Sequence, residues 1–232
     1  IGNPDLDPEE SVNTEIGVYY ENNDGFDANI TFFHNDFKNK ISSESIDDYT
    51  STYTNVGKAK TQGIEFSTKI PLYLEVLYLR LNYTYTDSEQ KDGENKGAKL
   101  TNTPEHMANA KLNWSVNDKL DTWLKAEYRD KTARFTSKYE NLSNVNKVVY
   151  DNLGANFKSY TVFNLGATYK LSKDITLNGA INNLFDKDFT KTHVLSSGST
   201  TTTAGDYFSS SQTTTGNVIP GRSLWVSATV NF

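Results

Sequence analysis

Cations and aromatic side chains gather in two long polar stretches of the sequence, 129–160 and 185–221. Guanidinium groups and Tyr faces can hold an anionic or aromatic group by charge, hydrogen bonding and cation–π contact. Taken singly, each residue has a plainer explanation, because it could be solvated or could order its own loop. Taken together they are the candidate binding residues, with Arg129 the strongest: Arg129, Arg134, Tyr139, Tyr150, Tyr160, Tyr207 and Phe208.

Side chains that catalysis or a metal would need are scattered or missing. The sequence has no cysteine, and its three histidines, His34, His106 and His193, lie far apart. No two histidines have metal-ligand spacing, and no spacing supports a Ser–His pair. We therefore expect no enzyme activity, no catalytic residue, no metal site and no resident cofactor.

Composition narrows the class of protein. Of the 232 residues, 36% are hydrophobic, which is low for a packed domain, yet 12% are aromatic, which is too many for a disordered chain. Many Tyr and Phe in a polar chain indicate strands that are apolar on one face only. The net charge of −6 argues against nucleic acid as a partner, and no run of about 18 apolar residues predicts a membrane helix.

Period-two alternation recurs along the whole chain and predicts strands, with no helix. The nine expected strands are 13–22, 26–36, 58–70, 77–87, 106–116, 120–131, 159–171, 175–184 and 222–232. Short connections at 22–25, 71–76, 116–119 and 172–174 alternate with long ones at 37–57, 88–105, 132–158 and 185–221. An outer-membrane barrel has this arrangement, with short turns in the periplasm and long loops outside.

The two faces of the expected strands differ in the way that a membrane barrel requires. One face carries no charge over about 9–11 residues per strand, which is the length of a tilted membrane-spanning strand. The other carries charges such as Arg80, Lys111 and Lys125. Aromatic residues of the uncharged face lie at both strand ends, near the short turns (Tyr20, Phe26, Trp114, Tyr169, Phe232) and near the long loops (Tyr83, Tyr85, Tyr128). A soluble sheet would explain the alternation but neither the length nor the aromatic rings, so we predict an all-β antiparallel transmembrane β-barrel.

The last strand ends on an aromatic residue. Its apolar positions are Leu224, Val226, Ala228, Val230 and Phe232, which we expect to face lipid. A terminal Phe after alternating apolar residues resembles the signal that the outer-membrane barrel assembly machinery reads. We therefore predict an assembly signal at this end of the chain.

Several segments resemble the C-terminal barrel of TonB-dependent outer-membrane receptors. They include "GNPDLDPEE" near the start, "NNLFDKDF" at 182–189 and the closing "GRSLWVSATVNF", while "YTDSEQKDGENKGAKLTNTPEHMANAKLNW" looks most like the branch that takes up ferric catecholate siderophores. The resemblance implies about 22 strands around a plug. Residues 1–232 would then be the C-terminal nine strands, with the plug domain and the earlier strands absent from this chain.

The resemblance also implies a function and partners. It implies TonB-energised uptake of an iron(III)-siderophore complex of catecholate type in the bacterial outer membrane, with TonB acting through the missing N-terminal part. Further implied partners are outer-membrane lipid and lipopolysaccharide, the barrel assembly machinery, and bacteriocins or phage. Uptake of haem or cobalamin, or a passive porin, stays an alternative, and His193 in a long loop leaves haem open.

Overall fold

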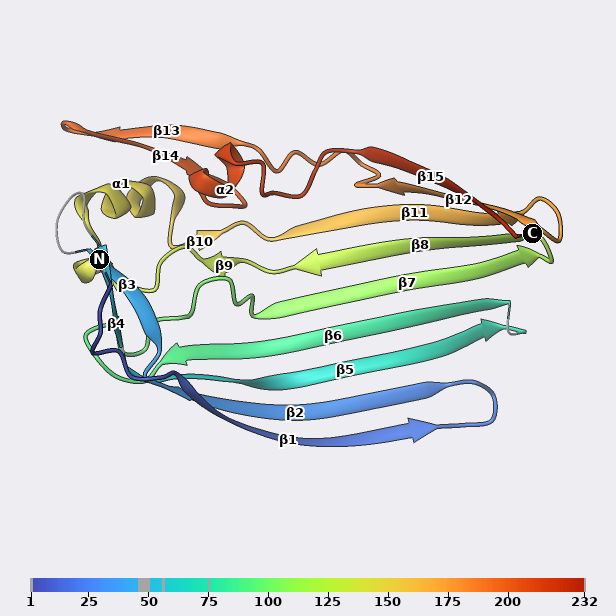
Figure 1. The fold of residues 1–232 in the computed structure, drawn as a ribbon, viewed down its shortest axis with the longest axis horizontal. Helices are drawn as coiled ribbons and strands as arrows, with labels where there is room; N and C mark the ends of the chain where they lie inside the picture. Colours follow the sequence, from blue (N-terminus) through green and yellow to red (C-terminus); the bar gives the residue numbers. More distant parts are fainter. Residues whose placement is uncertain (1, 46–50, 56, 75, 232) are drawn as a thin grey trace.

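A single curved antiparallel sheet forms most of the chain (Figure 1). The computed structural model describes residues 2–45, 51–55, 57–74 and 76–231. Nine strands of this sheet pair in chain order, each antiparallel to the next. They are β1 (Glu10–Glu21), β2 (Asp27–Lys38), β5 (Ala59–Tyr73), β6 (Leu77–Gln90), β7 (His106–Asn117), β8 (Leu120–Arg129), β11 (Tyr160–Lys170), β12 (Ile175–Asn182) and β15 (Ser223–Val230). The nine predicted strands and the antiparallel all-β class are confirmed.

Short turns join the strands at one end of the sheet, and long connections join them at the other (Figure 1). In the first turn, Gly25 adopts φ 79°, and the Asn22 side chain accepts hydrogen bonds from the backbone N–H groups of Asp24 and Phe26, each at 3.0 Å. Asn and Gly suit such tight turns because both tolerate conformations that other residues avoid. The alternation of short and long connections therefore places every long loop at the same end.

The prediction of no helix was wrong, because the long connections fold into elements of their own. They contain α1 (Asn144–Leu153), α2 (Ser210–Thr214), a 3₁₀ turn (Tyr139–Asn141) and three small two-stranded sheets: β3 (Ile41–Ser45) with β4 (Ser51–Asn55), β9 (Thr132–Ala133) with β10 (Asn156–Phe157), and β13 (Thr192–Ser197) with β14 (Thr200–Gly205). Ser143 caps α1 by accepting from the Asn146 N–H at 3.3 Å. Such short helices depend on caps and tertiary packing, here the burial of Val148 and Val149, which periodicity alone does not reveal.

Strand register puts the predicted apolar residues on one face. Direct pairing aligns Leu79, Leu112, Leu124, Leu165, Ile181 and Leu224 in one row across six strands. Many large apolar residues of this face are exposed, among them Val18 at 66% and Leu224 at 73%. An apolar surface of this extent marks contact with lipid or another apolar partner. We call it the lipid face and the opposite, polar face the lumen face.

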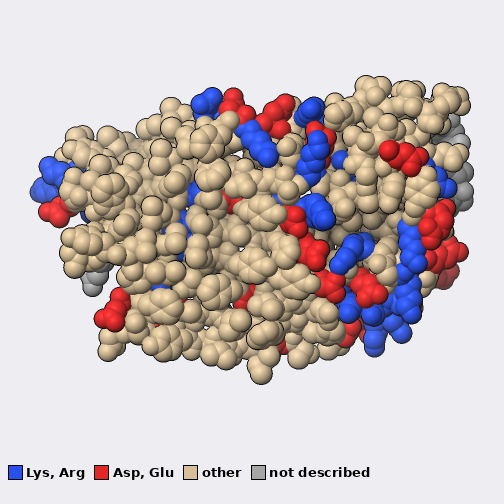
Figure 2. Space-filling model, turned by 180° about the vertical axis from the view of Figure 1, so that it is seen from behind, with Lys and Arg blue, Asp and Glu red and all other residues tan. Residues whose placement is uncertain are grey.

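Charged residues avoid much of the strand surface (Figure 2). On the side of the molecule that Figure 2 shows, Lys, Arg, Asp and Glu gather mainly toward the loop end, and the strands present mostly uncharged atoms. No helix among the described residues has the length and apolar character needed to cross a membrane.

A charge placed at the middle of the lipid face should be costly. Leu124 lies halfway along β8 and is 40% exposed on that face. In the intact barrel that carries this segment, we expect Leu124→Arg to reduce the free energy of unfolding by about 2–4 kcal/mol, because the guanidinium would enter hydrocarbon. Urea unfolding in lipid vesicles measures this. Asn109→Arg, opposite Glu127 on the lumen face, is the control and should change it by less than about 0.5 kcal/mol. Equal losses would contradict the assignment of the faces.

Candidate ligand-binding site

Two of the predicted binding residues face each other where the sheet meets the loops. Arg129 ends β8, Tyr160 begins β11, and the two are direct partners in the register. Alternation places Arg129 on the same face as Lys125 and Glu127, which is the lumen face. The Arg129 Nη2 donates to the backbone oxygen of Asn102 at 3.3 Å, so the 88–105 connection also reaches this point.

An aromatic cluster stands beside this pair. The Tyr160 ring centroid lies 5.0 Å from that of Phe189, 6.1 Å from Tyr207 and 6.2 Å from Phe208. Phe189 is only 1% exposed, and its ring meets Tyr207 edge-on at 5.3 Å. The Lys187 ammonium lies 4.9 Å from the Tyr207 ring centroid. Edge-to-face contacts of this kind fix ring orientation, so the cluster is a rigid aromatic surface with a cation attached.

Four of the seven predicted residues line one small cavity at this end of the sheet. The cavity has a volume of about 50 Å³, and Arg129, Tyr160, Tyr207 and Phe208 line it together with Lys158 and Gln212. These residues come from the end of β8, from the start of β11 and the segment just before it, and from α2 and the loop before it. The fold therefore brings together Arg129 and Phe208, which are 79 positions apart in sequence.

Tyr139 and Tyr150 belong to a second, separate group. Their ring centroids lie 4.9 Å apart, and Phe135 stacks 6.3 Å from Tyr150. Tyr139 is 42% exposed and donates to the Asp151 carboxylate at 3.4 Å, and this hydrogen bond raises the pKa of the Tyr139 hydroxyl. Neither tyrosine lines the cavity described above, so their part in ligand binding stays a prediction.

Arg134 is committed to the loops themselves. Its Nε donates to the oxygen of Asn156 at 3.0 Å, its Nη1 to the oxygen of Gly205 at 2.8 Å, and its guanidinium lies 4.2 Å from the Phe157 ring centroid. Burial lowers the pKa of this guanidinium. The negative charge of Asp206 acts to raise that pKa, but burial has the larger effect. These contacts join the 132–158 and 185–221 connections. Direct ligand contact by Arg134 remains a prediction.

Asp206 joins the same two connections through its carboxylate. Its side chain is 3% exposed, and its Oδ1 lies 3.1 Å from both the Lys158 Nζ and the His193 Nε2. The Lys158 N–H also donates to the Asp206 backbone oxygen at 2.9 Å. Burial acts to raise the pKa of Asp206, but the hydrogen bonds from Lys158 and His193 outweigh it and hold that pKa below its ordinary value.

Sequence reasoning missed Phe189, Lys158 and Asp206. Phe189 ends the "NNLFDKDF" segment, and Asp206 directly precedes the predicted Tyr207 and Phe208. One signal was available, since Asp206 is the only acidic residue after Asp188. An isolated acid within a Ser- and Thr-rich loop suggests a specific partner, but nothing in the sequence indicates which cations lie beside it.

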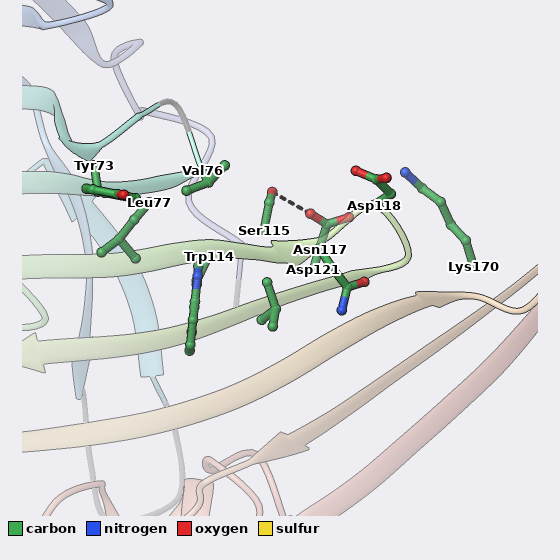
Figure 3. A pocket seen from close by; sticks show the side chains of 10 residues that line it. Tyr73, Val76, Leu77, Trp114, Ser115, Asn117, Asp118, Asp121 and Lys170 are labelled. Carbon is green, nitrogen blue, oxygen red and sulfur yellow. Dashed lines mark hydrogen bonds between the residues drawn. The ribbon is translucent and has the colours of Figure 1, made fainter.

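A larger cavity, of about 580 Å³, opens at the opposite, short-turn end (Figure 3). Tyr73, Trp114, Asp118 and Lys170 are among the residues that line it, and the Ser115 Oγ donates to the Asp121 carboxylate at 2.6 Å. None of the predicted binding residues contributes to it. Among the described parts of the chain, no group of three His, Cys, Asp or Glu side chains is arranged to hold a metal ion. The loop-end cluster is therefore the candidate site.

Consecutive antiparallel strands, a lipid face and structured loops at one end define the wall of an outer-membrane type of β-barrel. The family model described as "TonB dependent receptor-like, beta-barrel" matches residues 1–184. The chain belongs to this family of TonB-dependent receptor barrels, as its resemblance predicted, and its place is the outer membrane.

Its relatives point in the same direction. The chain is 36% identical to the iron-regulated outer membrane virulence protein of Vibrio cholerae, over 81% of this chain and 29% of that protein. It is 30% identical to the ferric enterobactin receptor PirA of Pseudomonas aeruginosa, over 100% of this chain and 29% of that one. A solved ferric enterobactin receptor variant of Pseudomonas aeruginosa, in complex with enterobactin, matches with a TM-score of 0.69 and 27% identity, over 97% of this chain and 32% of that chain. The chain thus spans about a third of the length of these relatives.

Acid should release the loops that Asp206 joins. A carboxylate whose pKa is lowered by folding stabilises the fold above its ordinary pKa of about 3.9, and that stabilisation is lost as the pH falls through the lowered value. At neutral pH, we expect Asp206→Asn to lower the free energy of local opening of residues 192–206 by about 1–3 kcal/mol. The variant should also lack the additional opening that the wild type shows below about pH 4. Hydrogen exchange, corrected for intrinsic rates, measures both.

Asp174→Asn, in an exposed short turn, is the matched control for Asp206 and should leave exchange in 192–206 unchanged. Wild-type protection in Asp206→Asn at neutral pH would show that the carboxylate does not hold the loops.

Proposed function

We propose that this chain is the C-terminal part of a receptor barrel that takes up ferric siderophores of catecholate type, driven by TonB. The single observation that carries the proposal is the convergence of Arg129 with Tyr160, Tyr207 and Phe208 at the loop end of the sheet. The names of the relatives support it, since PirA of Pseudomonas aeruginosa is called a ferric enterobactin receptor. In this proposal the plug and the earlier strands belong to the rest of the polypeptide, and the earlier strands pair with the free edges of β1 and β15.

The chemistry of the cluster suits an anion with flat aromatic arms. A ferric tris-catecholate carries negative charge on oxygen atoms around the metal, and its rings are planar. The Arg129 guanidinium and the Lys187 ammonium group supply positive charge beside the rings of Tyr160 and Tyr207. A planar guanidinium binds paired oxygens through parallel hydrogen bonds, and the rings offer edge and face contacts to the ligand. Iron would enter as part of the cargo and not as a resident metal.

Uptake of such a complex requires tight binding at the outer end of the barrel and then an input of energy that releases the complex inward. A scarce and bulky ligand is captured by affinity at the outer end, and inward release then has to overcome that affinity. TonB would supply the work through a part of the receptor outside these 232 residues. The loops joined by Asp206 and Arg134 would hold the aromatic cluster in its binding arrangement until release.

Haem is less well supported as the ligand. His193 was the residue that left haem open, but its Nε2 lies 3.1 Å from the buried Asp206 carboxylate. Coordination of iron through that nitrogen would break this contact with Asp206. Cobalamin uptake and passive diffusion have no specific observation in their favour. Lipopolysaccharide, the assembly machinery, and bacteriocins or phage remain proposed partners.

Loss of the Arg129 charge should weaken capture. With ferric enterobactin as the test catecholate, we expect Arg129→Ala to raise the Kd about 10- to 100-fold, because hydrogen bonds to charged groups contribute about 1.5–3 kcal/mol. Quenching of tryptophan fluorescence in the purified whole receptor measures the Kd. Lys173→Ala, in an exposed short turn, is the control and should bind as the wild type does.

An unchanged Kd for Arg129→Ala would remove this residue from the site. Growth on the ferric catecholate as sole iron source tests the wider proposal, since uptake by the receptor should require TonB. Growth that persists in cells lacking TonB would favour the passive porin.

The predicted assembly signal can be tested at the C-terminus. Leu224, Val226, Ala228 and Val230 lie on the lipid face of β15, paired with Ile181, Gly179, Leu177 and Ile175, while Phe232 lies outside the described residues. We expect deletion of Phe232 to slow insertion into the outer membrane, because the assembly machinery would lose the terminal aromatic group. Pulse-labelling and heat-modifiable mobility measure insertion. Insertion at the wild-type rate would contradict the signal.

A further inference from the structure

The cavity at the short-turn end of the sheet has the size of a ligand site, and the proposed function does not use it. Its volume of about 580 Å³ lies within the range of roughly 300–1,000 Å³ that ligand pockets commonly have. Its lining residues lie in 73–77, in 114–121 and at Lys170, the last residue of β11. Three neighbouring strand ends therefore contribute to one cavity at the edge of the membrane-facing wall.

The apolar part of the cavity lining belongs to the lipid face. Tyr73, Leu77 and Trp114 are register partners in series across β5, β6 and β7, so their side chains share that face. Tyr73 is 62% and Trp114 50% exposed. Exposed Tyr and Trp at a strand end are typical of the interface between hydrocarbon and head groups. A molecule in this part of the cavity thus lies where lipid tails meet their head groups.

The polar part of the cavity lining carries charge of both signs. Asp118 lies in the turn between β7 and β8, and Figure 3 shows its carboxylate and the Lys170 ammonium directed toward each other. Within the described residues these two groups form no ion pair within 4.0 Å. The Lys170 N–H donates to the Lys119 oxygen at 2.8 Å, and the Asn117 side chain accepts from the Lys119 N–H at 2.9 Å. The backbones that carry the two charges are therefore held together, while the charged groups stay apart.

We propose that this cavity binds a phospholipid with a phosphoethanolamine head group, from the leaflet on the short-turn side of the membrane. The Lys170 ammonium binds the phosphate, and the Asp118 carboxylate accepts hydrogen bonds from the ethanolamine ammonium. The first carbons of the tails lie against Trp114. The head group carries its two opposite charges on either side of a two-carbon spacer, which suits a separated pair of opposite charges on the protein. The inference does not depend on which ligand the receptor takes up.

Charge complementarity favours this head group over those of other phospholipids. A phosphatidylglycerol head group carries negative charge only, and it would place a like charge near Asp118. A choline head group has no N–H to donate to the carboxylate. Asp121 also lines the cavity, but the Ser115 hydroxyl already donates to it at 2.6 Å. A lipid that has both a phosphate and a free ammonium therefore matches Lys170 and Asp118 best.

Native mass spectrometry of the intact receptor tests the inference. The receptor, without siderophore, is released from nanodiscs that hold equal amounts of phosphatidylethanolamine, phosphatidylcholine and phosphatidylglycerol with identical tails, and the retained lipids are counted. We expect phosphatidylethanolamine to be retained about 10-fold over phosphatidylcholine, because only its ammonium donates a charge-assisted hydrogen bond to Asp118.

Variants assign the preference to this cavity. Asp118→Asn should reduce the preference for ethanolamine over choline to about twofold or less, and Lys170→Gln should lower the retention of all three phospholipids. Asp174→Asn and Lys173→Gln change exposed charges in the turn after β11, outside the cavity, and should retain lipid as the wild type does. Heat-modifiable mobility identifies the variants that are folded, and the wild-type comparison needs no variant.

Each result decides the inference. Equal retention of phosphatidylethanolamine and phosphatidylcholine by the wild type overturns it, and so does a preference for phosphatidylglycerol. A preference for ethanolamine that persists in Asp118→Asn also overturns it, because the head group would then be recognised elsewhere. Since the measurement uses no siderophore, it is separate from the proposed function. A receptor that retains phosphatidylethanolamine but does not bind ferric enterobactin keeps the lipid site and loses the proposed ligand.

Discussion

Hydrocarbon cannot hydrogen-bond to a peptide group, and every other feature of this chain depends on that constraint. A strand in a bilayer needs a partner on each side. The nine strands meet this need by pairing in chain order, so that each hairpin is also a pair of neighbours in the sheet. Successive connections in such a sheet lie on alternate sides of the membrane. Short turns therefore collect at one end of the sheet and long loops at the other.

Successive side chains along each strand point alternately toward lipid and toward the lumen. Residues such as Leu124 and Val226 contact lipid, while the residues between them contact whatever fills the lumen. The lumen face is free to carry charge because lipid never reaches it. It carries Arg129 near the loops and Lys69, Arg80, Lys111 and Lys125 nearer the turns.

Order in the loops depends on polar contacts as well as on buried apolar residues. Phe189 is buried among aromatic rings, but Asp206 and Arg134 join the two longest connections through charged groups and backbone oxygens. Buried charged contacts of this kind are specific, since a lost partner leaves an unpaired group. They also offer a means of release, because protonation or displacement of one group frees several contacts together. In the proposed function the site binds its ligand tightly and then releases it, and such an arrangement suits both steps.

The sequence by itself determined the strands, their pairing order, the lipid face and the end at which the loops lie. Period-two alternation and turn residues are local, and a bilayer imposes one rule on every strand, so local signals suffice. The sequence also indicated Arg129, Tyr160, Tyr207 and Phe208 by residue type. Only the tertiary structure decided that these four converge, that Arg134 and His193 are occupied by the loops, and that α1 forms. Those outcomes depend on contacts between distant segments, such as Lys158 with Asp206, and no local pattern encodes which segments meet.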